Sequence, residues 1–272
     1  MSKAKQLRNR IKSVKNTRKI TKTMEMVATS KLKRSQDRVV AARPYMQKLQ
    51  EMMADLTAEL PAEVVQKFPL LARRDPVKRV LIFVVTADRG LCGPFNSNVL
   101  KRARTLIEEE RAAGKGVVLH VGGRKGVAFF NFRKFEMAGS YTNLSDRPTF
   151  DDAQAFADIF AEAFLSGEVD EVKLVYAQFK SAVSQPPTVL SLLPIQGNRS
   201  TDDPAAASGA TGPGRPDGSK ATESSDGKAE GAAGSKGRKK IFEFVPSAEH
   251  ILGVLFPVYV RNTVYQVLVE SV

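Results

Sequence analysis

An apolar repeat with a seven-residue period runs through the first sixty residues and constrains the fold of this 272-residue chain most strongly. Alternating steps of four and three from Leu7 reach sixteen positions up to Leu60, and twelve of them are apolar. This spacing predicts one α-helix about 90 Å long, at 1.5 Å per residue, with a coiled-coil seam. Pro44 lies inside the repeat and predicts a bend near Ala41–Arg43 rather than an end. A helix of this length needs a partner along its seam.

The same helix is strongly basic. Residues 1–43 contain fourteen lysines and arginines but only two acids, Glu25 and Asp37, and so carry nearly all of the formal net charge of +13. This imbalance favours an acidic partner: nucleic acid, an anionic membrane surface or an acidic protein face. A solvated helix face is the alternative, although such faces usually mix both signs. DNA-binding zippers also combine basic stretches with heptads, but here the basic stretch itself carries the seam, which disfavours nucleic acid.

The composition also limits the classes of protein to which the chain can belong. The single cysteine, Cys92, excludes an internal disulfide and suits a reducing compartment. The basic N-terminus is not followed by the apolar segment of a signal peptide. The longest apolar run, Ile251–Val260, contains Pro257 and is too short to span a bilayer, so any membrane role is expected to be peripheral. No Cys/His cluster indicates a metal site, and no cofactor is expected.

Changes in composition predict five segments. They are a basic coiled-coil helix over 1–60, a proline-containing connector over 61–76, an α/β domain over 77–195, a disordered low-complexity insert over 196–240, and a strand with the start of a C-terminal helix over 241–272. The insert has no large apolar residue between Gly197 and Lys240. We expect Ile241–Val245 to resume a strand, Ser247 to cap a helix, and this helix to be interrupted near Pro257.

The segment 77–195 alternates apolar runs with helical patterns. Strands are predicted over Val77–Thr86, Gly116–Val121, Glu171–Phe179 and Thr188–Pro194, and helices over Ser97–Ala113, Arg124–Phe132 and Phe150–Leu165. The fold class is therefore α/β, with a mostly parallel, Rossmann-like sheet covered on both faces.

Two turns of this domain are candidate chemical sites. Val121–Gly126 (VGGRKG) follows a strand and opens a helix, where a phosphate loop would lie, but it lacks the spacing of known phosphate motifs. A tight structural turn is the favoured interpretation. Asp88–Asn96 (DRGLCGPFN) follows a strand end and contains Cys92. With only two histidines in the chain, a structural turn with a half-buried thiol is favoured over a nucleophile.

Several motifs resemble one family. They are Leu7–Lys22 (LRNRIKSVKNTRKITK), Thr23–Leu32 (TMEMVATSKL), Ala42–Tyr45 (ARPY), Thr86–Asn96 (TADRGLCGPFN), Gly122–Gly126 and Gln178–Pro194 (QFKSAVSQPPTVLSLLP). Their residues and order resemble the gamma subunit of F-type, proton-translocating ATP synthases over 1–195 and 241–270.

The resemblance implies a rotating central shaft and not an enzyme. In this family the N- and C-terminal helices form an antiparallel coiled coil inside a ring of alternating alpha and beta subunits, and catalysis takes place on beta. The α/β domain contacts the epsilon subunit and the membrane rotor ring. The implied location is peripheral, on the cytoplasmic face of the bacterial inner membrane, with no nucleic-acid partner.

The basic stretch Arg8–Lys33 is expected to contact an acidic lever segment of the beta subunits, with two methionines as adaptable packing residues. The expected contact residues are Arg8, Lys12, Lys15, Arg18, Lys19, Lys22, Met24, Met26, Lys31 and Lys33.

The chain also departs from the family. Pro94 replaces a usual second glycine, the polar insert is unusual, and the chain stops at Val272, whereas family members continue into a long C-terminal helix. The expectation is a helix whose seam, Leu7–Leu60, has no partner. Two alternatives stay open: a truncated or degenerate gamma-like protein that binds the synthase without coupling, and an α/β enzyme with a site at Asp88–Asn96.

Overall fold

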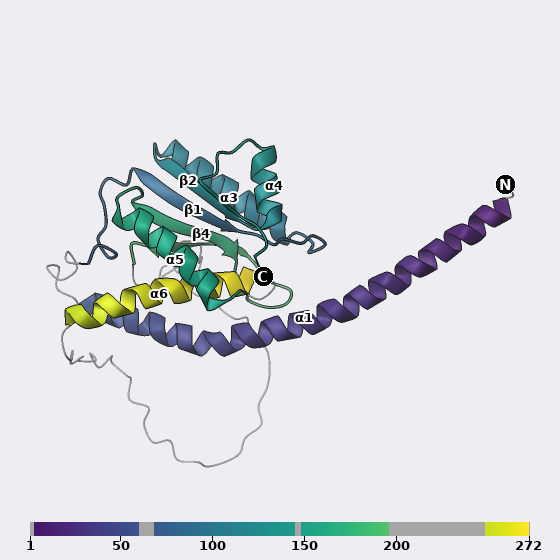
Figure 1. Ribbon diagram of the computed structural model, residues 1–272, viewed down its shortest axis with the longest axis horizontal. Helices are drawn as coiled ribbons and strands as arrows, with labels where there is room; N and C mark the ends of the chain where they lie inside the picture. The colour runs from purple at the N-terminus through teal and green to yellow at the C-terminus, as the bar shows by residue number, and fades with distance from the viewer. Residues whose placement is uncertain (1–2, 60–67, 145–147, 196–247, 272) are drawn as a thin grey trace, which may run out of the picture.

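A five-stranded sheet with helices on both faces forms the centre of the molecule, and one long helix projects from it (Figure 1). The computed structural model describes residues 3–59, 68–144, 148–195 and 248–271. In chain order the elements are α1 (Lys3–Glu59), β1 (Arg79–Val85), α3 (Phe95–Ala112), β2 (Gly116–Gly122), α4 (Arg124–Phe132), β3 (Gly139–Tyr141), α5 (Phe150–Leu165), β4 (Glu171–Ala177), β5 (Pro187–Leu193) and α6 (Ala248–Ser271).

The sheet has the order β3-β2-β1-β4-β5 and is parallel except for β5, which is antiparallel to β4. Val80 of β1 pairs with Val117 of β2 on one side and with Glu171 of β4 on the other. The predicted α/β class with a mostly parallel sheet is confirmed. The predicted strand bounds differ from the observed ones by no more than two residues.

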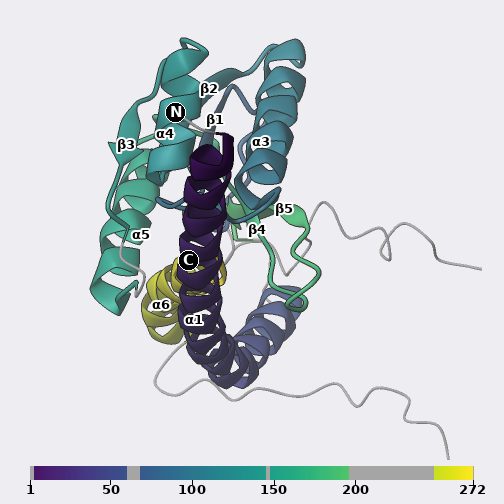
Figure 2. The same cartoon turned by 90° about the vertical axis from the view of Figure 1, so that its right-hand side faces the viewer.

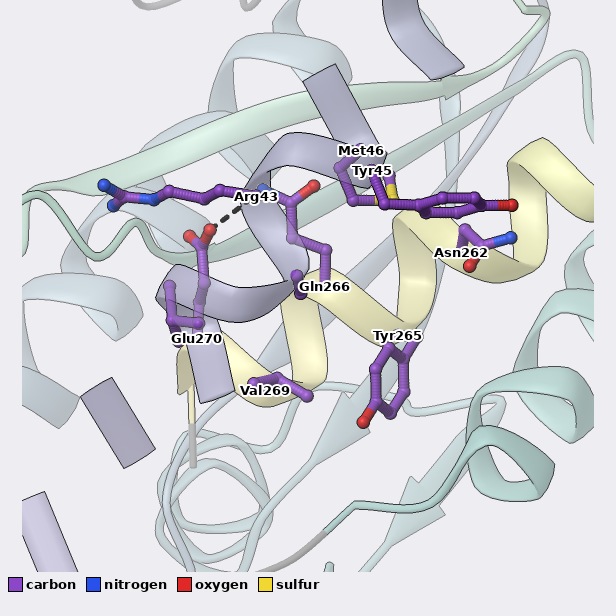
Figure 3. A pocket seen from close by; sticks show the side chains of 10 residues that line it. Arg43, Tyr45, Met46, Asn262, Tyr265, Gln266, Val269 and Glu270 are labelled. Atoms are coloured by element: carbon purple, nitrogen blue, oxygen red, sulfur yellow. Dashed lines mark hydrogen bonds between the residues drawn. The ribbon is translucent and has the colours of Figure 1, made fainter. Parts of the chain in front are cut away.

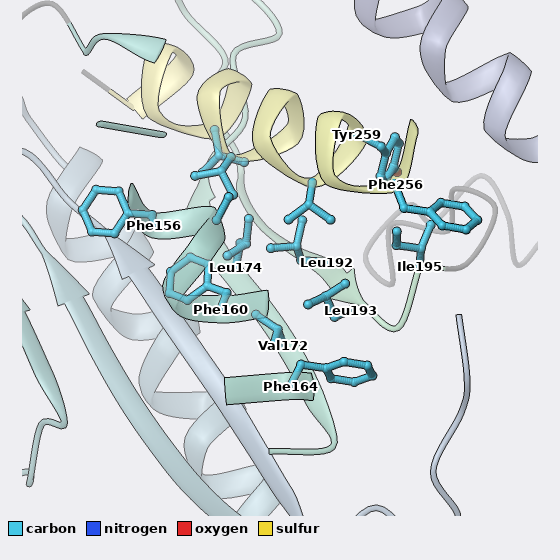
Figure 4. Close-up of a cluster of buried hydrophobic side chains, with 14 of the residues drawn as sticks. Phe156, Phe160, Phe164, Val172, Leu174, Leu192, Leu193, Ile195, Phe256 and Tyr259 are labelled. Carbon is cyan, nitrogen blue, oxygen red and sulfur yellow. The ribbon is translucent and has the colours of Figure 1, made fainter. Parts of the chain in front are cut away.

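Alternate residues of β1 enter two separate cores. Val80, Ile82 and Val84 pack with α3 and with Phe130 of α4. Leu81 and Phe83 face the other way, toward α5, α6 and the C-terminal half of α1. Figure 4 shows this second core, in which aromatic side chains of α5 meet residues of the sheet and of α6. Because both faces are covered, β1 is an uninterrupted apolar run rather than an alternating one.

The long helix α1 is confirmed and runs through Pro44 without ending, and it curves along its length (Figures 1 and 2). The expectation of an unpaired seam is correct only for its first half. Every residue from Lys3 to Arg34 is exposed. The second half of the seam is buried instead, at Val39, Met46, Leu49, Met53 and Leu56.

The cover over this second half is α6. It lies beside α1 and runs antiparallel to it (Figure 1). The expectation of a missing helical partner was therefore wrong for this half, because the residues after 248 already form a helix long enough to cover it. Leu60 lies outside the described residues.

The expected interruption of the last helix near Pro257 was also wrong. Helix α6 is continuous from Ala248 to Ser271. A proline removes one helix hydrogen bond and crowds the carbonyl four residues earlier, but the residues beside Pro257, Phe256 and Tyr259 among them, are buried in the core and hold the helix in place. By length and composition, Ile251–Ser271 is apolar enough to cross a membrane. Its buried residues, among them Leu252, Phe256 and Val264, instead belong to the core shared with α1 and α5.

The short edge strand β3 was not predicted. Three residues are too few to show a periodicity, and the strand depends on its pairing with His120–Gly122 of β2 and on the packing of Tyr141 against the core. The predictions for the insert 196–240, for a strand at Ile241–Val245 and for a cap at Ser247 lie outside the described residues. The predicted segment boundaries therefore remain predictions.

Candidate interaction surface on the long helix

The exposed half of α1 carries all ten expected contact residues. Its helix buries no side chain against the rest of the described chain up to Arg34. Threonine hydroxyls at positions 17, 21, 23 and 29 hydrogen-bond to carbonyls three or four residues earlier, so these polar groups are satisfied within the helix. Glu25, the one acid in the sequence from Lys3 to Arg34, forms an ion pair with Lys22 at 3.1 Å. The half therefore presents positive charge together with apolar seam residues.

One part of this surface is a groove between α1 and the loop that follows β1. The groove has a volume of about 900 Å³. Its lining comprises Lys19, Ile20, Thr23, Met24, Val27, Ala28 and Lys31 of α1 with Arg89, Gly90 and Leu91 of the loop. We call it the α1–loop groove. It combines apolar side chains with three basic ones, a composition that fits an amphipathic acidic segment.

The structure brings only some of the expected contact residues together. Lys19, Met24 and Lys31 line the α1–loop groove. Met26 and Lys33 line a second hollow along the helix, next to Glu25. The remaining ones, Arg8, Lys12, Lys15, Arg18 and Lys22, are exposed outside both hollows. Their contact with a partner stays a prediction.

The loop residues of the groove were missed as contact residues from the sequence. Leu91 is 94% exposed and has a φ of 64°, an unfavourable conformation for a branched side chain. The motif Thr86–Asn96 contained the signal, since an exposed leucine among turn residues is typical of a contact loop. The residue pattern of Asp88–Asn96 by itself favours a structural turn, with an enzymatic site as the alternative, and does not indicate a contact surface.

Asn96 holds this loop in shape. Its side-chain oxygen accepts a hydrogen bond from the Ala87 N–H at 2.9 Å, and its amide nitrogen lies 3.0 Å from the Cys92 Sγ. The Cys92 thiol is exposed, not half-buried as expected. His120 lies within β2 beside Tyr141, with Nδ1 and the phenol oxygen 3.1 Å apart, so it does not pair with Cys92. Among the histidine side chains that the structure describes, none therefore serves Cys92 as the base that a cysteine nucleophile needs.

The turn Val121–Gly126 is filled by the chain's own groups. The Arg124 N–H donates to the Asp88 carboxylate at 2.7 Å, and the Gly126 N–H donates to the Thr86 hydroxyl at 2.9 Å. Gly123 has a φ of 94°, and a Cβ there would lie 2.1 Å from the Thr86 carbonyl oxygen. A phosphate would have to displace Asp88, so the geometry supports the interpretation as a tight turn. Within the described part of the chain, no group of three His, Cys, Asp or Glu side chains could hold a metal ion.

An exposed basic helix on an α/β base, whose turns are occupied by their own side chains, defines a subunit that works by contact within an assembly. Comparisons with known proteins specify the assembly. A family model described as ATP synthase matches residues 3–272. The ATP synthase gamma chain of Gemmatimonas aurantiaca is 42% identical over 271 residues, which cover 100% of this chain and 81% of that relative. The gamma chain of Leptospira biflexa is 34% identical over 272 residues, which make up 100% of this chain and 82% of that relative.

The chain therefore belongs to the ATP synthase gamma-chain family. It is a non-catalytic, central-stalk subunit of the membrane-associated ATP synthase complex. Two solved structures share its fold. The Tetrahymena thermophila mitochondrial ATP synthase central stalk matches with a TM-score of 0.57 and 23% identity, over 93% of this chain and 92% of that one. The Euglena gracilis mitochondrial ATP synthase rotor matches with a TM-score of 0.53 and 20% identity, over 97% of this chain and 83% of that one.

Proposed function

We propose that this chain is the rotating shaft that couples proton flow through the membrane sector to ATP synthesis in a catalytic hexamer of alpha and beta subunits. The α/β domain forms the foot, which contacts the epsilon subunit and the membrane rotor ring, on the cytoplasmic face of the bacterial inner membrane. The exposed half of α1 enters the hexamer. The two matching solved structures, a central stalk with its c-ring and a rotor, support this arrangement.

The observation that carries the proposal is the α1–loop groove. It presents Lys19, Lys31 and Arg89 around apolar side chains of α1 and Leu91. An acidic, amphipathic lever of the beta subunit is the partner that this chemistry fits, because carboxylates meet the basic groups while apolar residues meet the seam. Such a contact lets a rotating, asymmetric helix bias each beta subunit in turn.

The test is proton pumping by a reconstituted complex that contains the full chain. Lys19→Gln with Lys31→Gln is expected to reduce the number of protons pumped per ATP hydrolysed. Lys48→Gln is the matched control, because Lys48 is an exposed lysine of the same helix outside the basic stretch. An unchanged ratio in the groove variant would contradict the contact. A wild-type chain that assembles but never pumps would instead support the alternative of a gamma-like protein that binds without coupling.

A further inference from the structure

A loop of the α/β domain joins α1 and α6 at their crossing. Phe179 lies in the segment 178–186 between β4 and β5. Its carbonyl accepts a hydrogen bond from the Arg43 guanidinium of α1 at 2.5 Å, and its N–H donates to the Glu270 carboxylate of α6 at 3.1 Å. The Arg43 guanidinium carbon also lies 6.0 Å from the centroid of the Phe179 ring, within the range of a cation–π contact. We call this arrangement the Phe179 junction.

Glu270 is held from its own helix as well. Gln266, one turn earlier on α6, donates to the other carboxylate oxygen at 2.9 Å, a hydrogen bond that Figure 3 marks with a dashed line. The hydrogen bond from Gln266 therefore orients the Glu270 carboxylate toward the Phe179 N–H. Hydrogen bonds that involve a charged group are stronger and more directional than neutral ones, and partial burial increases their strength. The junction can thus fix the relative positions of α1, α6 and the loop 178–186. Apolar contacts are less directional and would fix them less precisely.

Two hollows border the junction. One, of about 100 Å³, lies between α1 and α6 and is lined by Val39, Ala42 and Met46 of α1 and by Tyr265 and Val269 of α6. A more polar hollow of about 440 Å³ lies on the other side, toward Gln47 and Lys180. Arg43, Met46, Gln266 and Glu270 line both. The side chains of the junction therefore lie between these two hollows, and their polar contacts oppose a shift of α1.

The exposed half of α1 magnifies any such shift. The roughly 40 residues before Arg43 form a lever of about 60 Å, so a tilt of about 5° at the junction moves the far end by about 5 Å. A displacement of this size would take the basic residues out of contact with a partner that holds a fixed position.

We propose that the Phe179 junction is the positioning contact that fixes the angle of α1 on the α/β domain, so that rotation of the domain turns the helix without slippage. This inference rests on the function proposed above and adds the residues through which torque passes from foot to shaft. Arg43 and Glu270 act as positioning residues, since each acts through the backbone of Phe179, which joins their two helices.

The first test measures coupling in the reconstituted complex. Arg43→Ala and Glu270→Ala are each expected to leave ATP hydrolysis near the wild-type rate and to reduce proton pumping per ATP by about three- to tenfold, the range typical of changes in coupling energy. Glu270→Gln keeps an oxygen acceptor for the Phe179 N–H and is expected to pump nearly normally. Arg43→Lys keeps the charge and the alkyl stem, and an intermediate loss is expected.

The second test measures the helix angle in the full chain alone. In a Cys92→Ser background, spin labels at Ser30 of α1 and Lys101 of α3, both exposed, report the distance between shaft and domain. The distance distribution is expected to broaden in Arg43→Ala and not in Lys48→Gln. A wild-type chain that never pumps contradicts the proposed function itself. A wild type that pumps, with normal pumping and unchanged distances in Arg43→Ala, Arg43→Lys and Glu270→Ala, overturns the junction.

Discussion

The Lys173 ammonium of β4 donates a hydrogen bond to the Glu110 carboxylate of α3 in a site where both side chains are largely buried. Lys115 binds the same carboxylate at 2.7 Å, and Glu171 lies 3.1 Å from Lys173. These four side chains fasten α3 to one end of the sheet.

We expect Lys173→Ala to lower the free energy of unfolding by about 3 kcal/mol, because it leaves buried carboxylates with one cation fewer. Urea unfolding of the full chain measures this value. A double variant, Glu110→Met with Lys173→Met, removes both charges and should recover much of the loss. The single variants Glu110→Met and Lys173→Met complete the cycle, and a loss in the double variant equal to the sum of their losses would show that the two groups do not interact.

The same pair predicts a dependence on acid. Burial on its own raises the pKa of Glu110, but the hydrogen bonds and charges of Lys115 and Lys173 outweigh it and lower that pKa below 4.5. The stabilisation is therefore complete above pH 4.5 and is lost as the pH falls from there through the folded-state pKa. Glu110→Gln is expected to unfold with a weaker pH dependence in this window. If the free energy of unfolding depended on pH equally in the wild type and the variant, Glu110 would not be the group responsible.

Gly123 predicts the largest effect of a single added methyl group. Its φ of 94° is unfavourable for other residues, and a Cβ would lie 2.1 Å from the Thr86 carbonyl oxygen. Gly123→Ala should lower the free energy of unfolding by about 3 kcal/mol. Gly253→Ala is the control: it lies in the exposed face of α6 with nothing within 4 Å, and it should stabilise the chain by about 0.5–1 kcal/mol. Urea unfolding of each variant beside the wild type measures the two changes in the free energy of unfolding.

Periodicity explains why so much of the architecture could be predicted. The heptads predicted α1, and the uninterrupted apolar run of β1 indicated a strand covered on both faces, as Leu81 and Ile82 show by entering opposite cores. A repeat reports that a face is apolar but not what covers it. Leu56 and Leu7 occupy equivalent seam positions, yet only Leu56 is buried, because its cover comes from a helix about two hundred residues later.

The candidate site was predictable only in part, for a related reason. Charge counts located the basic half of α1, but the groove also needs Leu91, whose exposure depends on the loop held by Asn96. Arg43 looked like one more member of a basic run. Its partner is the backbone carbonyl of Phe179, a group that every residue carries, so no side-chain pattern could have indicated it.

His120 predicts a second pH effect. Burial lowers its pKa below the ordinary 6.5, while Glu168 acts weakly in the opposite direction. The folded chain therefore binds this proton less readily than the unfolded chain does. The free energy of unfolding should be constant above about pH 6.5, set by the ordinary histidine pKa, and fall as the pH decreases through that value. Denaturation at a series of pH values measures this slope, and His120→Gln should reduce it. If the free energy of unfolding of His120→Gln depended on pH as strongly as that of the wild type, other groups would be responsible for the effect.

The two halves of the α1 seam predict opposite outcomes for one substitution. Leu49 is 5% exposed and packs with the core around α6, whereas Leu7 is 58% exposed. Leu49→Ala should lower the free energy of unfolding of the full chain by about 3 kcal/mol through lost burial and a residual cavity. Leu7→Ala should change it by less than about 0.5 kcal/mol, as for other surface substitutions. Both variants remove the same atoms from the same helix, so helix propensity cancels to first order. Equal losses at the two positions would mean that the exposed half of the seam is also covered in the free chain.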